Sequence, residues 1–273
     1  MNAFHFMLGI FAVVIGASVG SFLNAVADRV PEDRSILWPM TYCEGCERHL
    51  SFIDMIPVLS YLWPQGKCQN CKAGIHPKAL LVEVATGGLF LAVYLIYGFG
   101  VDFVILASCL SLLVVVSVTD LEKGLILDVM VFPSIVLLLI MAPFWTEIGF
   151  SREFLGDETL LASFANSSLS GLGAFLAFFI VAMINPAGMG GGDVKFAAAL
   201  GLMVGFPGIL MALWISVIGG GIFAIILILT SKKGRKDTIP FGPFMAVGAA
   251  VVLIAGPDII NWYQDLASAV SGS

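Results

Sequence analysis

The sequence is poor in charge. Lys, Arg, Asp and Glu make up 12% of its 273 residues, whereas they make up about 25% of soluble domains. Hydrophobic residues reach 59%. The formal net charge is −6, and this lack of a basic excess argues against a nucleic-acid partner, which needs a positively charged face. The composition therefore predicts an integral membrane protein.

Histidine is also scarce, and familiar catalytic signatures are missing. The chain has three His and no H-E-x-x-H, which argues against the usual zinc protease site. The stretch GMGGGDVK (188–195) is not a phosphate loop, because Asp193 follows the last glycine and Phe196 follows the lysine. The first apolar segment lacks a basic start and a small-x-small cleavage site, so we expect a retained helix rather than a cleaved signal peptide.

Long apolar runs dominate what is present. A membrane-spanning helix needs roughly 20 mostly apolar residues, and the sequence offers about eight candidates. One of them, 193–206, is short enough to be partly re-entrant. The fold class predicted is an all-α polytopic membrane protein with about eight transmembrane helices. The candidates lie near 4–27, 79–98, 101–119, 125–145, 166–185, 193–206, 207–230 and 242–263.

The basic residues predict an orientation. Lys and Arg accumulate on the cytoplasmic side of membrane proteins. In an eight-span arrangement, all but one of the 13 Lys and Arg residues fall on one side. The exception is Arg152. We therefore expect both termini outside and four cytoplasmic segments, namely 28–78, 120–124, 186–195 and 231–241.

The 28–78 segment is the only sizeable polar block, and it carries two C-x2-C pairs, Cys43/Cys46 and Cys68/Cys71. Two such pairs complete a tetrahedral four-sulfur site of the kind that structural zinc prefers. A reducing cytosol disfavours disulfides. We predict a small cytoplasmic zinc-knuckle domain at 28–78, preceded by the first transmembrane helix at 1–27 and followed by a membrane core at 79–273.

Four acidic residues fall within predicted spans near their cytoplasmic ends, or at those ends: Glu83, Asp120, Asp128 and Asp193. An ionisable group at the bilayer centre costs about 2.5–3.5 kcal/mol on insertion scales, so each needs a reason. For one acid near a helix end, the simplest interpretation is an interfacial carboxylate facing water. Asp193 also fits a capping role, because a carboxylate at a helix start accepts hydrogen bonds from free backbone N–H groups.

The predicted orientation puts Asp120 and Asp193 on the same side at the same depth. Two converging carboxylates share a proton, so that one activates a water molecule while the other polarises a carbonyl. This aspartic-protease chemistry needs no metal and no Ser or Cys nucleophile. Asp128, eight residues after Asp120 and on the same face of a helix, is a rival for the pair, and spacing does not decide between them. The glycines before Asp193 would let a substrate backbone come close.

Seven stretches of the sequence match a known pattern: GASVGSFLNAVADRVP (16–31), CEGC (43–46), DMIPVLSYL (54–62), CQNC (68–71), DLEKGLILD (120–128), GGGD (190–193) and PFGPFMAVGA (240–249). Together they resemble the bacterial type IV prepilin peptidases, which are membrane aspartic proteases of the G-x-G-D class. The resemblance covers nearly the whole chain. It implies that Asp120, rather than Asp128, is the catalytic partner of Asp193.

The resemblance also implies the reaction. Such enzymes remove the short basic leader from type IV prepilins and pseudopilins at the cytoplasmic face of the bacterial inner membrane, after a glycine and typically before a phenylalanine. Relatives with the cysteine domain also N-methylate the new amino terminus with S-adenosylmethionine as donor, so we expect both activities. The chain has no soluble-type methyltransferase fingerprint, and the donor site rests on the resemblance alone. Asn24 and Glu83 are its candidate residues, or else they form helix-to-helix hydrogen bonds.

Two positions depart from the family pattern. Leu127 stands where the family usually has a proline between Ile and Asp, which alters a helix start but not the acid. Met55 stands where the family often has Asn, which concerns methyl transfer only. Lys195 has no assigned function: its side chain either snorkels to the interface or attracts an acidic residue expected early in mature pilins.

Three other functions compete. One is a transporter with a zinc-stabilised cytoplasmic domain, whose acids form a proton or cation path. Another is a non-enzymatic assembly-platform protein, and a third is a peptidase that has lost methylation. The partners expected are prepilins, pseudopilins and the lipid bilayer.

Overall fold

The computed structural model describes residues 3–35, 46, 70–72, 77–150, 152–186, 188–230 and 239–271, with side chains described up to residue 256. In these ranges the chain is helical and forms no β-strand. The α helices are α1 (Ala3–Arg29), α3 (Lys78–Tyr97), α4 (Val101–Lys123), α5 (Asp128–Met141), α6 (Leu160–Ile184), α7 (Gly191–Val204), α8 (Gly208–Leu229) and α9 (Gly242–Ser271). Three short 3-10 helices are η1 (Val30–Glu32), η3 (Ala142–Phe144) and η4 (Thr146–Ile148).

Each predicted span coincides with one of these helices, so the all-α prediction is confirmed for the described part of the chain. Five helices, α1, α3, α4, α6 and α8, are long and apolar enough to cross a membrane. The helices α5 and α7 have 14 residues each, which corresponds to about 21 Å. The apolar stretch described in α9 is also short. An eight-span topology therefore stays a prediction.

Local sequence signals explain where several helices begin and end. The side chain of Thr159 accepts a hydrogen bond from the backbone N–H of Ala162 and caps α6. The helix α4 ends before Gly124, which takes a left-handed φ of 63° and donates its N–H to the carbonyl of Asp120. A glycine at this position is a common helix stop because it has no β-carbon to strain the left-handed conformation. The stop leaves Asp120 in the last turn of α4.

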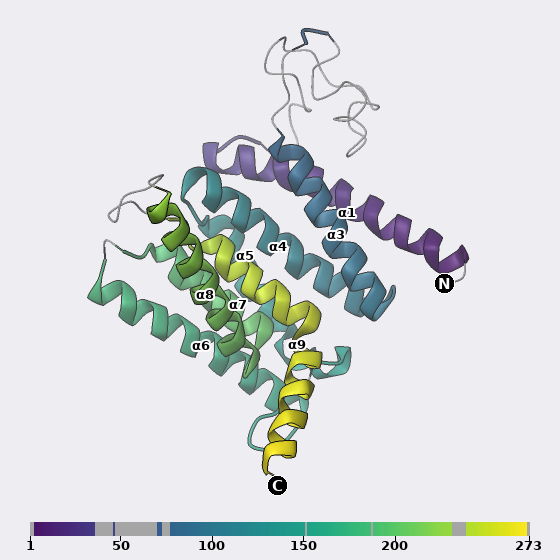
Figure 1. Ribbon diagram of the computed structural model, residues 1–273, viewed down its shortest axis with the longest axis vertical. Helices are drawn as coiled ribbons and strands as arrows, with labels where there is room; N and C mark the ends of the chain where they lie inside the picture. The colour runs from purple at the N-terminus through teal and green to yellow at the C-terminus, as the bar shows by residue number, and fades with distance from the viewer. Residues whose placement is uncertain are drawn as a thin grey trace. The chain divides into compact units, whose positions relative to one another are not determined.

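The chain divides into two compact units, Met1–Val118 and Thr119–Ser273. In the first unit, α1 and α3 pack closely (Figure 1). A β-carbon added at Gly16 would lie 2.8 Å from the Cα of Gly87, and one at Gly20 would lie 2.8 Å from the Cα of Glu83. The absence of side chains lets the two backbones approach, as is common between membrane helices. The Gly16-x3-Gly20 pattern is thus a helix-packing surface.

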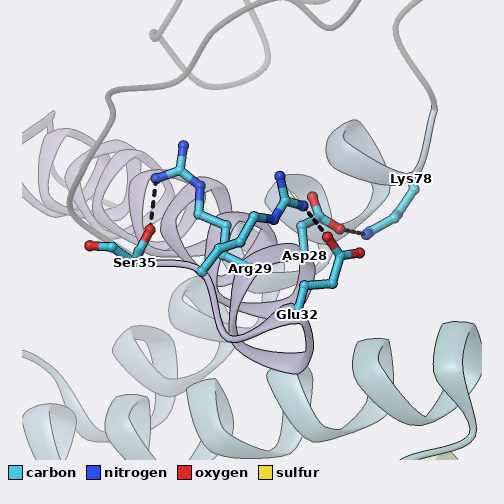
Figure 2. Close-up of polar contacts among 6 residues, drawn as sticks. Asp28, Arg29, Glu32, Ser35 and Lys78 are labelled. Atoms are coloured by element: carbon cyan, nitrogen blue, oxygen red, sulfur yellow. Dashed lines mark hydrogen bonds and ion pairs between the residues drawn. The ribbon is translucent and has the colours of Figure 1, made fainter.

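Polar contacts join these two helices where α1 ends and α3 begins. Lys78 Nζ lies 2.7 Å from Asp28 Oδ1 and links the start of α3 to the end of α1 (Figure 2). Beside this pair, Arg29 donates to the carbonyl of Ser35 at 3.4 Å, and Arg34 pairs with Glu32 at 2.6 Å. These contacts fix the ends of both helices next to the segment that carries the cysteine pairs.

In the second unit, small residues again set the packing. The helices α6 and α7 meet at Gly171 and Gly201, where a β-carbon on Gly201 would lie 2.6 Å from the Cα of Gly171 and would also strike the carbonyl of Ser170. The helices α8 and α9 meet at Gly248, whose missing side chain leaves room for the carbonyl of Ala212. Close contacts of this kind let α7 pack directly against the backbone of α6.

A buried cluster holds the end of α7, and we name it the Arg152 cluster: Trp145, Arg152, Asn166 and Phe206. Arg152 is 1% exposed, donates to the carbonyl of Met203 at 2.8 Å and lies over the ring of Trp145 at 5.1 Å. Asn166 accepts from the backbone N–H of Phe206 at 2.8 Å and donates to its carbonyl at 3.1 Å. A cation suits the carbonyl end of a helix, so the cluster caps α7 at the end opposite Asp193.

Candidate active site

Asp193 lies in the first turn of α7, as the third residue of the helix. Its Oδ2 accepts a hydrogen bond from the backbone N–H of Gly190 at 3.2 Å. This is the capping contact that the sequence suggested, in which the acid satisfies a free N–H group at a helix start. A capping role and a catalytic role use different oxygens of one carboxylate and are compatible.

Asp120 is 6% exposed and lies in the last turn of α4. Its Oδ2 accepts a hydrogen bond from the backbone N–H of Gly242 at 2.8 Å. Gly242 is the first residue of α9, so the free N–H of a helix start points at the carboxylate, as in many anion sites. A β-carbon on Gly242 would lie 2.7 Å from the same oxygen, which shows how closely α9 approaches the acid.

The structure brings Asp120 and Asp193 together. The charge of Asp120 acts on Asp193, and both acids belong to the second compact unit. Two α helices, α5 and α6, lie between them in the chain. The chain leaves the site along α5 and returns to it along α6. This topology explains why an acid at the end of α4 meets an acid at the start of α7.

The glycines before Asp193 differ in their surroundings. A β-carbon on Gly192 would lie 2.8 Å from Cβ and 3.2 Å from the carbonyl oxygen of Ile126. A β-carbon on Gly191 would meet nothing within 4 Å. The expectation that all these glycines admit a substrate backbone needs correction at Gly192, because the chain's own Ile126 occupies that space. At Gly191 the space is open.

Asp128 begins α5 and contacts a different partner. Both of its carboxylate oxygens accept hydrogen bonds from Lys195 Nζ, at 2.7 and 2.8 Å. The side chains of Asp128 and Lys195 are 55% and 34% exposed. Asp128 is thus paired with a lysine, and the charge that acts on Asp193 is that of Asp120, which favours Asp120 as the partner of Asp193.

Asn24 and Glu83, the candidates for the methyl-donor site, lie on α1 and α3 of the first unit. They are 8% and 5% exposed. The side-chain amide of Asn24 donates to the carbonyl of Ala79 at 3.1 Å, so this residue does form a helix-to-helix hydrogen bond. Its Oδ1 is buried and has no hydrogen-bond partner among the described residues.

Two of the four cysteines fall outside the described residues. Cys43 and Cys68 are outside them, whereas Cys46 is partly exposed and Cys71 is exposed. Within the described ranges, no group of three or more His, Cys, Asp or Glu could hold a metal ion. Since half of the predicted ligands lie outside those ranges, the zinc site remains a prediction.

A cavity of about 590 Å³ lies elsewhere in the second unit, between α6, α8 and residues 153–155. Asn166 and Phe206 of the Arg152 cluster line it. The cavity is therefore at the end of α7 opposite Asp193, about 20 Å away along the helix. It is not part of the candidate active site.

Sequence reasoning assigned no role to Gly242. The stretch PFGPFMAVGA resembles the family pattern, and locally the glycine stands between Phe241 and Pro243, just before an apolar run. A proline in the first turn of a helix is common because it needs no N–H partner there. That signal locates a helix start, but it does not reveal a contact 122 residues away in sequence.

Comparison with known proteins identifies the family. A model described as the bacterial peptidase A24 N-terminal domain matches residues 14–97, and one described as the type IV leader peptidase family matches residues 105–225. The chain belongs to the type IV leader peptidase family. As a member of this family, it is a peptidase with the two acids, Asp120 and Asp193, inside the second matched region.

Curated relatives of the family align over nearly the full chain. Proteins named prepilin leader peptidase/N-methyltransferase from Bacillus subtilis (strain 168), Aeromonas salmonicida (strain A449) and Pseudomonas aeruginosa are each 29% identical to this peptidase. The alignments cover 93%, 90% and 93% of this chain, and 97%, 90% and 93% of the relatives. No solved structure gave a significant match.

Proposed function

We propose that this protein is an aspartic endopeptidase that removes the basic leader from type IV prepilins and pseudopilins. The observation that carries the proposal is the pair Asp120 and Asp193, whose charges interact and whose Oδ2 atoms each accept a glycine N–H. The names of the relatives supply the substrate class. The family membership supplies the peptidase activity.

The reaction proposed uses these two carboxylates alone. One takes a proton from a water molecule while the water oxygen attacks the carbonyl carbon of the scissile bond. The other, protonated, donates its proton to the carbonyl oxygen, which gives a tetrahedral intermediate. The intermediate collapses when the leaving nitrogen takes a proton and the C–N bond breaks. The bonds from Gly242 and Gly190 would hold each Oδ2, so that each Oδ1 can face the water.

We infer that this site faces the cytoplasm of a bacterial inner membrane and that both termini lie outside. The support is the charge distribution, with Arg152 as the single basic residue on the opposite side. Arg152 is bound at the far end of α7 from Asp193, as this orientation requires. The basic leader of a prepilin would then meet the acids without crossing the bilayer.

We further propose that the enzyme N-methylates the new amino terminus, as the names of the relatives suggest. Bound S-adenosylmethionine would supply an electrophilic methyl group. The polar atoms of Asn24 and Glu83 fit one part of this donor, because an amide oxygen and a carboxylate are acceptors for its ammonium group. The buried Oδ1 of Asn24, which has no hydrogen-bond partner among the described residues, is the atom we assign to it.

We also propose that Cys43, Cys46, Cys68 and Cys71 bind one structural zinc ion. The support is the spacing of two C-x2-C pairs in a polar block too small to bury a large core. Elemental analysis of the purified protein should give one zinc per chain. In Cys43→Ser that content should fall sharply; an unchanged zinc content would contradict the assignment.

The test of the peptidase uses the full chain in lipid and a labelled prepilin-type peptide with a basic leader, a glycine–phenylalanine junction and an apolar helix. We expect Asp120→Asn and Asp193→Asn to reduce cleavage about 100- to 10,000-fold, the range that acid–base groups contribute. Asp102→Asn is the matched control, because Asp102 lies in the first turn of the same α4 and should leave cleavage intact.

Two outcomes would contradict parts of the proposal. Full cleavage by either Asp→Asn variant would exclude the pair as the catalytic machinery. A pH-driven ion flux in proteoliposomes without any cleavage would favour the transporter instead. Mass spectrometry of the cleaved product, with and without methyl donor, then shows whether one methyl group is added.

A further inference from the structure

The ion pair between Asp128 and Lys195 has no part in the chemistry proposed above, yet it joins the two segments that carry the catalytic acids. Residues 120–128 run from the end of α4 to the start of α5, and residues 192–195 form the start of α7. Two contacts connect them. Ile126 fills the space beside Gly192, and Asp128 binds Lys195.

The two charged residues of α7 point in different directions. Successive residues in an α-helix are 100° apart, so Asp193 and Lys195 lie about 200° apart around the axis. Asp193 accepts the N–H of Gly190, whereas Lys195 contacts the first turns of α5, with Nζ 2.7 Å from Asp128 Oδ1 and 5.2 Å from the ring centre of Phe132. A contact on each side determines how α7 is rotated about its axis.

Buried side chains such as Val194 and Phe196 pack the inner face of α7, whereas the Asp128–Lys195 pair is a polar contact on its more exposed side. Gly190, Gly191 and Gly192 precede Asp193, and glycines leave the backbone free to turn. Lys195 is the first residue after the glycines that carries a long polar side chain. Its contact with both carboxylate oxygens of Asp128 therefore adds a polar restraint to the first turns of α7, next to the glycines.

We propose that the Asp128–Lys195 pair is a positioning device, which holds α7 at the rotation that turns Asp193 toward Asp120. The inference rests on the proposed peptidase function. The pair is half exposed, and such pairs add little to the free energy of unfolding. Its effect on catalysis should be larger, because a small misplacement of a reacting group costs much of the rate. The two effects can be separated by measurement.

The experiment compares Lys195→Gln, Asp128→Asn, Lys195→Arg and the charge-reversed double variant Asp128→Lys/Lys195→Asp, each as the full chain in lipid. We expect either neutralising variant to lower kcat about tenfold, with KM within about twofold of the wild-type value. Lys195→Arg and the double variant should restore most of kcat, because an ion pair re-forms in both. The midpoint of thermal unfolding should move little in all four.

The chain offers a matched control in its first unit. Lys78 and Asp28 also lie 2.7 Å apart, with side chains 20% and 54% exposed, and they join α1 to α3. Lys78→Gln and Asp28→Asn should leave peptidase kcat unchanged. A loss of kcat in these variants equal to that in Lys195→Gln would show a general effect of membrane-surface charge and overturn the inference.

Each of the remaining outcomes would overturn the positioning role of the pair. If the double variant stays as inactive as the single ones, or if KM rises while kcat holds, Lys195 contacts the substrate and the positioning role is wrong. If the single variants keep full kcat, the pair has no role in the reaction. If the wild-type protein leaves the prepilin-type peptide intact, the proposed function fails and this inference falls with it, a result distinct from a failed rescue.

Discussion

Gly192 has the least room of the three glycines before Asp193. Its missing side chain leaves space for Ile126, 2.8 Å from where a β-carbon would be. Ile126 belongs to the segment that ends in Asp128 and begins with Asp120, so any displacement here acts on both acids. The glycine is thus required by contact within the protein, whereas the sequence suggested contact with a substrate.

A pair of substitutions tests this residue. Gly192→Ala should lower the cleavage rate about 10- to 100-fold, because the new methyl group pushes Ile126 and α7 apart and misplaces Asp193. Gly191→Ala should retain most of the rate, since nothing lies within 4 Å of its new methyl group. Initial rates with the prepilin-type peptide compare the two. Equal losses would indicate that backbone freedom, rather than space, is what the glycines provide.

At the level of single residues, the sequence drew attention to the two acids but not to the groups that contact them. Asp193 stood out because an acid after three glycines at the start of an apolar run is unusual. Asp120 could be preferred over Asp128 only through the family resemblance. The N–H of Gly242 and the Asp128–Lys195 pair depend on contacts between positions 122 and 67 residues apart, which no spacing rule relates.

The helix α7 is restrained along its whole length. The Asp128–Lys195 pair holds its start, Gly201 lets its middle approach α6, and the Arg152 cluster binds its last carbonyls. The sequence indicated a short and unusual segment here, because an apolar run of 14 residues is below the length of an ordinary span. How such a segment is held depends on neighbouring helices and could not be derived from its own residues.

The contact between α6 and α7 can be tested by its effect on stability. Gly201→Ala should lower the free energy of unfolding by about 1–3 kcal/mol, because the added methyl group meets backbone atoms of Ser170 and Gly171 and overpacks the contact. Gly173→Ala, on the same α6, meets nothing within 4 Å and should raise it by up to about 1 kcal/mol through helix propensity. Thermal unfolding in detergent measures both.

An opposite ranking of these two variants would be informative. If Gly173→Ala were the more destabilising, α6 would have to contact another surface at that position. If neither variant changed the midpoint of unfolding, α6 and α7 would separate before the rest of the protein unfolds. The close contact at Gly201 predicts instead that Gly201→Ala is the destabilising variant.

For the whole molecule, the number of helices that cross the bilayer determines where the site lies. Composition and charge predict eight spans, and five helices in the described part of the chain are long and apolar enough to cross. The remaining three, α5, α7 and the described part of α9, are short, and the position of the site relative to the membrane depends on them. An even number of crossings between Asp120 and Asp193 is required for the two acids to meet at one face.

Reporter fusions can test the last of these crossings. Green fluorescent protein inserted into the 231–238 segment should fluoresce, because four basic residues mark that segment as cytoplasmic. Alkaline phosphatase fused after the final residue should be active, since we expect the C-terminus outside. With the reporters exchanged, neither should be active: alkaline phosphatase in the 231–238 segment would be inside, and green fluorescent protein after the final residue would be outside. If green fluorescent protein fluoresced at both positions, α9 would not cross the membrane, and the C-terminus would lie inside rather than outside.

The bond between Gly242 and Asp120 has a consequence for how the enzyme is made. A ribosome delivers Asp120 first, Asp193 later and Gly242 last, and the membrane receives the helices in that order. An unfinished chain would hold both acids without the N–H group that holds the first of them in place. Proteolysis would thus begin only after the final helix has been inserted, and pilin precursors near a growing chain would stay intact until then.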